Sequence, residues 1–192
     1  MKENILFIDV CSKYCNLAII RNNVIIGTHS AATNNNLTDL LVEHIYLLLQ
    51  KQKIKRSEIT SIYLNKGPGS FTGTRVGAVV AKTWANVKSD FKLYTIDSLR
   101  LQAIPNCISL IDARGNKSYI AVYVNDKVVI EPQMILKADI VNYYHQYPEL
   151  KNREQSNLLP DDIFNNLINR LPFFEEVTNI NELKPLYIKD AL

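Results

Sequence analysis

Hydrophobic residues in the first hundred positions form either short continuous runs or stretches with helical spacing. The short runs predict five strands, at residues 5–10, 17–20, 24–28, 62–64 and 92–96. An Asn22-Asn23 pair separates the second and third runs, and a pair of this kind between apolar runs is a hairpin signal. We therefore expect the chain to begin with three consecutive antiparallel strands.

One stretch with helical spacing, residues 37–50, is apolar over more than one face. Its inward stripe consists of Leu37, Leu40, Leu41, His44, Ile45 and Leu48. Tyr46, Leu47 and Leu49 widen the apolar surface beyond that stripe. Because such a helix needs more than one neighbour, we expect the sheet on one side and a second helix or a partner chain on the other. His44 is expected to be a packed histidine rather than a ligand.

A glycine-rich stretch, residues 66–77, lies between the fourth strand and a second predicted helix. Gly67 and Gly69 on either side of Pro68 predict a tight turn. The spacing is not that of a Walker loop, and Thr72 stands where a dinucleotide fingerprint would have its third glycine. Three interpretations stay open: a phosphate-binding loop, a structural turn that begins a packed helix, or part of a partner surface. Spacing alone favours the structural turn.

The helix after this turn carries small residues at every fourth position. Ser70 or Thr72 is a candidate N-cap, because a side-chain oxygen can accept from the free N–H groups of the first turn. The small residues that would share one helix face are Gly73, Gly77, Ala81 and Ala85. Such a thin face lets another backbone approach closely.

The second half of the chain repeats the opening pattern and then degrades. Apolar runs at 107–112, 118–124 and 127–130 predict strands, with Asn125-Asp126 as the turn between the last two. The first of these runs ends in Asp112, and Asp9 has the equivalent place near the end of the first run of the chain. Helical stretches are expected at 138–147 and 161–171, and an extended tail at 183–189.

This repetition predicts an α/β protein with two lobes of one topology. The first lobe, residues 1–104, has the order β-β-β-α-β-α-β-α, in which the last helix is short and ends before Pro105. The second, residues 105–192, is a shortened copy. Antiparallel strands followed by helix-strand alternation indicate a mixed sheet with crossover helices.

Charge and composition exclude several classes of protein. Twenty-two basic and 19 acidic residues give a net charge of +3, and the basic residues are too scattered for a nucleic-acid footprint. No apolar run is long enough to suggest a signal or a membrane span, so we expect a cytoplasmic protein with reduced cysteines. The three histidines lack the spacing of a helix-borne zinc site.

Asp9 and Asp112 are the nearest approach to a catalytic pair. Two carboxylates across a cleft can hold a magnesium-bound nucleotide. However, the turn after Asp9 has no glycine and the turn after Asp112 has only Gly115, so a close backbone approach to phosphate is not favoured.

Four segments resemble those of the bacterial TsaB family, also called YeaZ, and they occur in the family's order. They are Ile8-Asp9, residues 62–77, Ile111-Asp112-Ala113-Arg114 with Tyr119, and Pro185-Leu186-Tyr187-Ile188-Lys189. The glycine segment is long and specific, and the resemblance spans nearly the whole chain. It implies the fold of the actin, hexokinase and Hsp70 group, the ASKHA or RNase H-like fold, in agreement with the duplicated lobes.

The resemblance also implies a function. TsaB-like proteins act in making N6-threonylcarbamoyladenosine at position 37 of tRNAs that read codons beginning with A. They are not the catalyst but pair with a TsaD-like paralogue that carries the metal, and a TsaE-like ATPase joins them. By this resemblance the chain binds no cofactor alone, magnesium-bound ATP or ADP lies at the joint surface, and tRNA is contacted indirectly. Whether the isolated chain forms a homodimer is a question that the sequence does not decide.

Family partner contacts come largely from the first two helices. This implies an interface at Leu37, Leu40, Leu41, His44, Leu48, Gly73, Val76, Gly77, Val80 and Ala81. The motif residues that could lie near a nucleotide are Asp9, Gly67, Pro68, Gly69, Ser70, Phe71, Thr72, Arg75, Asp112 and Arg114. The rival hypotheses are an autonomous ATPase or kinase of the same fold, and a metallopeptidase-like protein.

Overall fold

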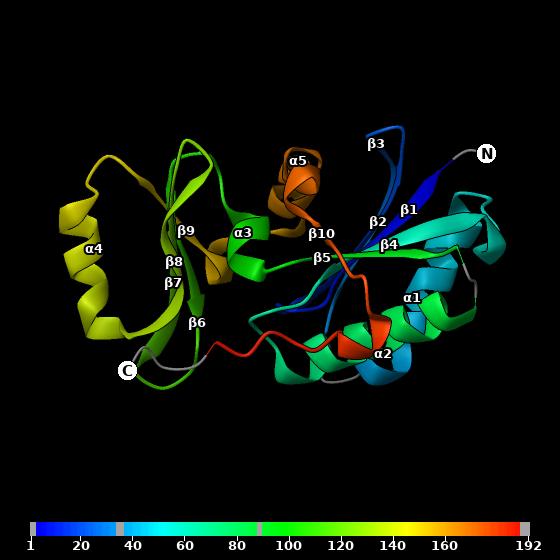
Figure 1. Ribbon diagram of the computed structural model, residues 1–192, viewed down its shortest axis with the longest axis horizontal. Helices are drawn as coiled ribbons and strands as arrows, with labels where there is room; N and C mark the ends of the chain where they lie inside the picture. The colour runs from blue at the N-terminus through cyan, green and yellow to red at the C-terminus, as the bar shows by residue number, and fades with distance from the viewer. Residues whose placement is uncertain (1–2, 34–36, 88–89, 189–192) are drawn as a thin grey trace.

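The computed structural model describes residues 3–33, 37–87 and 90–188, which form two mixed sheets (Figure 1). The first sheet has the strand order β10-β5-β4-β1-β2-β3. Its strands are β1 (Asn4–Asp9), β2 (Tyr14–Arg21), β3 (Val24–Ala32), β4 (Ile59–Asn65), β5 (Lys92–Ile96) and β10 (Glu175–Glu176). The three opening strands are antiparallel and β4 runs parallel to β1, as the sequence predicts.

The second sheet repeats the core of the first. Its order is β8-β7-β6-β9, from β6 (Cys107–Asp112), β7 (Lys117–Val124), β8 (Lys127–Leu136) and β9 (Lys151–Glu154). β6 pairs antiparallel with β7 and parallel with β9, as β1 does with β2 and β4. This repetition confirms the duplicated α/β fold.

Helices cover both faces of the first sheet. α1 (Leu37–Lys51) and α2 (Phe71–Val87) lie on one face and α5 (Pro160–Arg170) on the other (Figure 1). α3 (Ser98–Gln102) lies between the sheets, and α4 (Ile140–Gln146) packs on the second sheet. Short 3-10 helices occur at Arg56–Glu58, Lys137–Asp139, Gln155–Asn157, Leu171–Phe173 and Ile180–Glu182.

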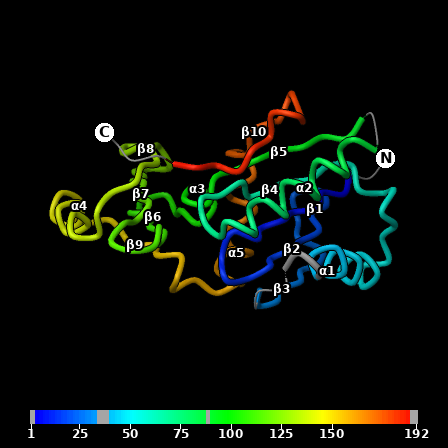
Figure 2. The backbone as a smooth tube through the Cα atoms, turned by 90° about the horizontal axis from the view of Figure 1, so that it is seen from below, coloured from blue at the N-terminus to red at the C-terminus, as the bar shows by residue number. Residues whose placement is uncertain are grey.

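The expected division into residues 1–104 and 105–192 needs correction at its C-terminal side. Ile163, Phe164 and Leu167 of α5 belong to the same buried cluster as Phe7 and Ile20 of the first sheet. β10 extends that sheet by pairing with β5. The helices α1 and α2 cover one apolar face of the first sheet, and α5 from the later part of the chain packs on the other face. Figure 2 shows this return of the chain to the first sheet.

The small-residue face of α2 points into the protein. Gly73, Gly77 and Ala81 are buried, and a Cβ added at Gly73 would lie 1.8 Å from the carbonyl oxygen of Val10. At Gly77 the nearest atoms are side-chain methyls of Val10 and Leu64, at 3.0 and 3.2 Å. The thin face therefore lets α2 pack directly on the sheet and the turn after β1.

A pair of histidines joins α1 to the edge strand β3. Nε2 of His29 and Nδ1 of His44 are 2.9 Å apart, so one ring donates and the other accepts. Burial first, and then the charges of His44 and Lys51, lower the pKa of His29 from its ordinary value of 6.5. His44 is thus a packed histidine, as the sequence predicts.

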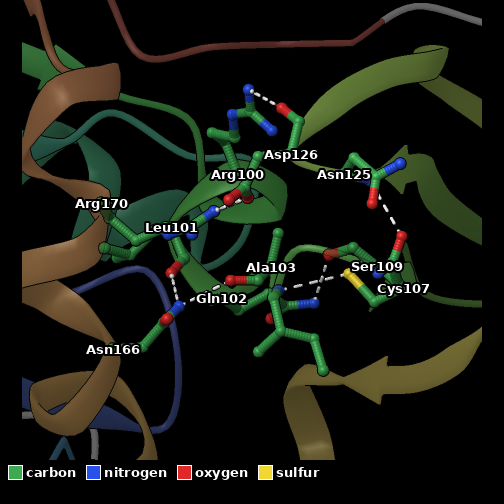
Figure 3. Close-up of polar contacts among 12 residues, drawn as sticks. Arg100, Leu101, Gln102, Ala103, Cys107, Ser109, Asn125, Asp126, Asn166 and Arg170 are labelled. Atoms are coloured by element: carbon green, nitrogen blue, oxygen red, sulfur yellow. Dashed lines mark hydrogen bonds and ion pairs between the residues drawn. The ribbon is translucent and has the colours of Figure 1, made fainter.

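α3 and α5 hold the two sheets together through buried polar groups (Figure 3). The Gln102 amide donates to Oγ of Ser109, and Asn166 of α5 donates to the carbonyls of Leu101 and Ala103. These bonds satisfy backbone groups where α3 ends, so the junction between the lobes is a packed and hydrogen-bonded unit.

One aspartate in the β7–β8 turn serves two arginines at this junction. Nη1 of Arg170, whose side chain is 2% exposed, lies 2.6 Å from Oδ1 of Asp126. Nη2 of Arg100 donates to the carbonyl oxygen of Asp126 at 2.7 Å. Both guanidinium groups also stack on Phe173, at 4.9 and 3.9 Å from its ring centre. The Asp126 carboxylate is what balances the buried charge of Arg170.

Replacing Asp126 with Ala is expected to lower the free energy of unfolding by about 3–5 kcal/mol, because Arg170 loses its counter-charge. Asp126→Asn keeps an acceptor oxygen and tolerates the φ of 62° at this turn, so its loss should be smaller. Asn23→Ala is the matched control, since Asn23 has a φ of 58° in the first hairpin and should cost about 1 kcal/mol. Chemical denaturation measures all three; equal losses for Asp126→Ala and Asn23→Ala would contradict the role of the carboxylate.

Gly73→Ala is expected to cost at least about 3 kcal/mol or to prevent folding, because the clash is with backbone atoms that cannot move aside. Gly77→Ala should cost less, since two side-chain methyls can shift by a few tenths of an ångström. Thermal and urea unfolding check this order. A Gly73→Ala protein as stable as the wild type would refute the close packing.

The stability of the fold should decrease as pH falls below about 6.5. The folded state binds the His29 proton more weakly than the unfolded state does, so stability that is present above pH 6.5 is lost as the unfolded chain takes up its proton. His29→Gln should remove this part of the slope, whereas His145→Gln, on the exposed side of α4, should not. Unfolding temperatures between about pH 7.5 and 5.5 measure it; parallel slopes for wild type and His29→Gln would be the contrary result.

Candidate functional site

The glycine loop docks onto the turn that follows β1. A Cβ at Gly69 would lie 2.1 Å from the carbonyl oxygen of Cys11, and the Ser70 N–H donates to that oxygen at 2.8 Å. Ser70 is the N-cap of α2, because its Oγ accepts from the N–H of Gly73. Loop and turn therefore form one unit that positions the start of α2.

The Asp9 carboxylate stabilises this unit through buried hydrogen bonds. Its carboxylate accepts from the Cys11 N–H and from the side-chain amides of Asn16 and Asn65. Asn65 in turn accepts through Oδ1 from the Gly67 N–H and the Ser98 hydroxyl. Burial raises the pKa of Asp9, and its three hydrogen bonds oppose that effect. Asp9 is thus an acceptor at the centre of a buried network.

This arrangement does not suit a phosphate-binding loop. The N–H groups of Gly67, Ser70, Gly73 and Thr74 all have intramolecular acceptors. The space beside Gly69 and Gly73 that a phosphate would need is filled by backbone carbonyl oxygens of Cys11 and Val10, which repel anions. The glycines serve close packing, which is the structural interpretation favoured by their spacing.

Asp9 and Asp112 do not line a common cavity. Asp9 lies in a small pocket that Asn16, Asn65 and Gln102 also line. Asp112 is exposed at the end of β6, where a hydrogen bond from Lys137 at 3.0 Å lowers its pKa. The lobes repeat in topology, but the two carboxylates have different surroundings.

A second pocket, of about 320 Å³, opens between the lobes beside the glycine loop. One wall is the start of α2 with Phe71 and Thr74, and the opposite wall is the β6–β7 turn with Asp112 and Arg114. The C-terminal segment closes the pocket with Tyr187. Several motif residues expected near a nucleotide thus meet here, namely Pro68, Gly69, Phe71, Asp112 and Arg114.

A third feature is an apolar groove of about 510 Å³ between α1 and α2, which we call the helix groove. It is lined by Val42, Ile45, Tyr46, Leu49, Arg56, Val79, Val80, Thr83 and Trp84. Val42, Tyr46 and Val79 are 58–63% exposed, a high value for apolar side chains that lie side by side. The Arg56 guanidinium stacks on Trp84 at 5.5 Å, so a charge borders the groove.

The structure corrects much of the expected partner surface. Leu41, Leu48, Gly73, Gly77 and Ala81 are buried within the chain and face the sheet. Leu40, His44, Val76 and Val80 are partly buried, and of these only Val80 lines the helix groove. The side chain of Leu37 lies outside the described residues. The helices are as expected, but their outward faces carry other residues.

One sequence signal pointed to groove residues that the expected partner surface does not include. Tyr46, Leu47 and Leu49 exceed the stripe needed to pack α1, and Tyr46 and Leu47 prove to be exposed. On α2 the positions beside the small residues, Val79 and Val80, flank the groove. Two of the three apolar residues outside the inward stripe thus indicated an exposed surface, whereas Leu49 is buried at the base of the groove.

Two other features of the described chain bear on function. Within residues 3–33, 37–87 and 90–188, no three His, Cys, Asp or Glu side chains gather as a metal site requires. None of the described helices is both long and apolar enough to cross a bilayer.

Comparison with known proteins places these features in a family. A family model described as TsaD, tRNA N6-adenosine threonylcarbamoyltransferase, matches residues 22–168. An uncharacterized Mycoplasma pneumoniae protein, the MG208 homolog, is 35% identical over 190 residues, which is 97% of this chain and 95% of the relative. The Bacillus subtilis tRNA threonylcarbamoyladenosine biosynthesis protein TsaB is 28% identical over 125 residues, covering 62% of this chain and 54% of that protein.

A solved structure gives the same result at the level of fold. The Pseudomonas aeruginosa protein described as similar to peptidase YeaZ superposes with a TM-score of 0.76 at 17% identity, over 97% of this chain and all of the other. With the matched family model and the near full-length relative, the chain belongs to the family that this model describes, in its TsaB (YeaZ) group.

Proposed function

We propose that this protein is a non-catalytic subunit in the synthesis of N6-threonylcarbamoyladenosine on tRNA, and that it binds a TsaD-like paralogue through the helix groove. The proposal is carried by one observation, the exposed apolar groove between α1 and α2. Relatives that are named for this pathway support the choice of partner.

The helix groove has the properties of a protein interface. Its lining is mainly apolar and includes Tyr46, Trp84 and Arg56, and aromatic residues and arginine are enriched at protein interfaces. The groove is formed by two helices that the sheet holds rigidly from behind, because Leu41 and Leu48 of α1 and Ala81 of α2 are buried in one cluster. A partner would thus meet a preorganised surface, which reduces the entropic cost of binding.

The inter-lobe site supports an accessory role. Asp9 accepts three hydrogen bonds within the protein, and the glycine loop is packed on carbonyl oxygens. An enzyme of this fold that transfers phosphate needs both groups open to its nucleotide. This chain uses them to set the position of α2, and so to shape one side of the helix groove.

The remaining members of the assembly follow from the same proposal. A TsaE-like ATPase joins the pair in the cytoplasm, tRNA is contacted mainly through the partner, and magnesium-bound ATP or ADP lies at the joint surface. In the absence of the paralogue, a second copy of this chain can cover the helix groove, because an exposed apolar surface favours self-association.

The test of the interface is Val79→Glu, which places a charge in the middle of the helix groove. Val79 is 63% exposed, so the folded protein should keep its stability, whereas affinity for the purified paralogue should fall roughly 30-fold or more. Val87→Glu is the matched control, because Val87 is on the same helix, 68% exposed and outside the groove lining. Calorimetry measures binding, and sedimentation shows whether a homodimer dissociates in parallel. Equal binding by both variants would contradict the interface.

The subunit role is tested by reconstitution. Paralogue, TsaE-like ATPase, tRNA, ATP and threonylcarbamoyl-adenylate should form the modified base only when this chain is added. Full activity without it would refute the proposal. Tight binding of magnesium-bound ATP by the isolated chain would instead favour an autonomous ATPase.

A further inference from the structure

The pocket between the lobes is lined by aromatic side chains on several sides. Three aromatic rings line it, Phe71 from α2, Tyr119 from β7 and Tyr187 from the C-terminal segment. Phe71 and Tyr187 are 51% and 52% exposed. Three segments far apart in the sequence thus bring flat apolar surfaces to one opening, and water covers much of that surface in the free protein.

Two of these rings are held in place by an arginine outside the pocket. The Arg75 guanidinium lies 3.7 Å from the ring centre of Phe71, and its Nε donates to the hydroxyl of Tyr187 at 3.1 Å. The rings of Phe71 and Tyr187 are 6.2 Å apart. One side of Phe71 is therefore covered by the guanidinium, and rotation of Tyr187 is restricted. Aromatic surfaces fixed in this way lose little entropy when a ligand stacks on them.

The opposite wall provides charge. Arg114 follows Asp112 in the β6–β7 turn, where its φ of 69° and that of Gly115, 59°, reverse the chain. Its backbone N–H donates to the Asp112 carboxylate. The Arg114 side chain is exposed and forms no hydrogen bond or ion pair with the rest of the described chain. An arginine in this state is available to an anion, and Oδ2 of Asp112 beside it can accept from an amino group.

The volume of the pocket and the packing of the glycine loop limit the class of ligand that can bind. At about 320 Å³ the pocket is at the lower end of the range for small-molecule sites. The loop on the α2 side does not suit a chain of phosphates, because Gly69 and Gly73 face carbonyl oxygens and the N–H groups of Gly67, Ser70, Gly73 and Thr74 already have acceptors. What remains is room for one flat ring that stacks on the aromatic side chains, with one anionic group at Arg114.

We propose that this pocket binds a single nucleotide unit, a base stacked against Phe71 and Tyr187 with its phosphate at Arg114. Unpaired bases of RNA are recognised in this way, by stacking on aromatic side chains next to an arginine. A free mononucleotide has the same chemistry, and the experiment separates the two sources. This consequence rests on the proposed function: the pocket would let the subunit contact an unpaired nucleotide of the RNA substrate directly.

The probes are a fluorescein-labelled oligoadenylate, a labelled strand of the same length that carries no bases, and AMP. Fluorescence anisotropy of the purified chain at several salt concentrations gives the affinity for each strand, and AMP is added as competitor. Tyr187→Ala should weaken binding of the oligoadenylate roughly five- to 100-fold, since one stacking surface is lost. Arg114→Ala should weaken it and lower the slope of log K against log salt by roughly 0.7, for one phosphate contact.

Matched controls separate these effects from damage to the fold. Tyr187→Phe keeps the ring and loses only the hydrogen bond from Arg75, so it should bind more tightly than Tyr187→Ala does. Tyr46→Ala removes an equally exposed aromatic ring from the helix groove, and Lys127→Ala removes an exposed charge on β8; both should leave oligoadenylate binding unchanged. Tyr46→Ala should weaken paralogue binding, whereas Arg114→Ala should not, so failure of one proposal is distinguishable from failure of the other.

The outcomes are distinct. If binding of the oligoadenylate depends on Arg114 and Tyr187, and is weaker for the strand that carries no bases, the result supports the pocket with RNA as the source. If AMP displaces the strand and binds with a dissociation constant equal to that of the strand, the result supports the pocket with a free mononucleotide as its ligand. Absence of binding by all probes, or equal binding by Arg114→Ala, Tyr187→Ala and wild type, overturns the proposal.

Discussion

The backbone contact between the glycine loop and the turn after β1 is the constraint on which the rest of this structure depends. Gly69 and Gly73 touch the carbonyl oxygens of Cys11 and Val10 at distances that admit no side chain. This contact sets the start of α2 and, through Gly77 and Ala81, its closeness to the sheet. The position of α2 then determines the helix groove on one side and the inter-lobe pocket at its N-terminal end. One contact thus relates the two surfaces to which we assign functions.

Local sequence signals were sufficient for most of the architecture. The pairs Asn22-Asn23 and Asn125-Asp126 adopt positive φ at all four positions, which is the geometry of two-residue hairpin turns. Asparagine and aspartate tolerate that geometry, so these pairs between apolar runs indicated both hairpins and hence the duplication. Ser70 caps α2 for an equally local reason, because its side-chain oxygen lies next to free N–H groups.

The features that the sequence did not predict depend on contacts between distant segments of the chain. β9 is a strand of polar residues, Lys151–Glu154, that is defined by pairing with β6 and not by an apolar pattern of its own. β10 consists of two glutamates and exists only because it completes the edge of β5. The periodicity of Gly73, Gly77 and Ala81 indicated a thin helix face but carried no information on whether that face meets the sheet or a partner. Directions of this kind depend on contacts between distant segments, and the same limit hid the pocket that Phe71, Arg114 and Tyr187 share.

The return of the chain end to the first sheet has a consequence for synthesis on the ribosome. α5 covers one face of that sheet, β10 pairs with β5, and the Leu186 N–H donates to the carbonyl of Lys66. Because translation proceeds from the N-terminus, β1 to β5 emerge well before these covering segments. During that interval the nascent chain exposes Phe7, Ala18 and Ile20 on a bare sheet face and an unpaired edge at β5. The first half to be made is therefore the last to be completed, because its sheet stays uncovered until α5 and β10 have emerged and folded onto it.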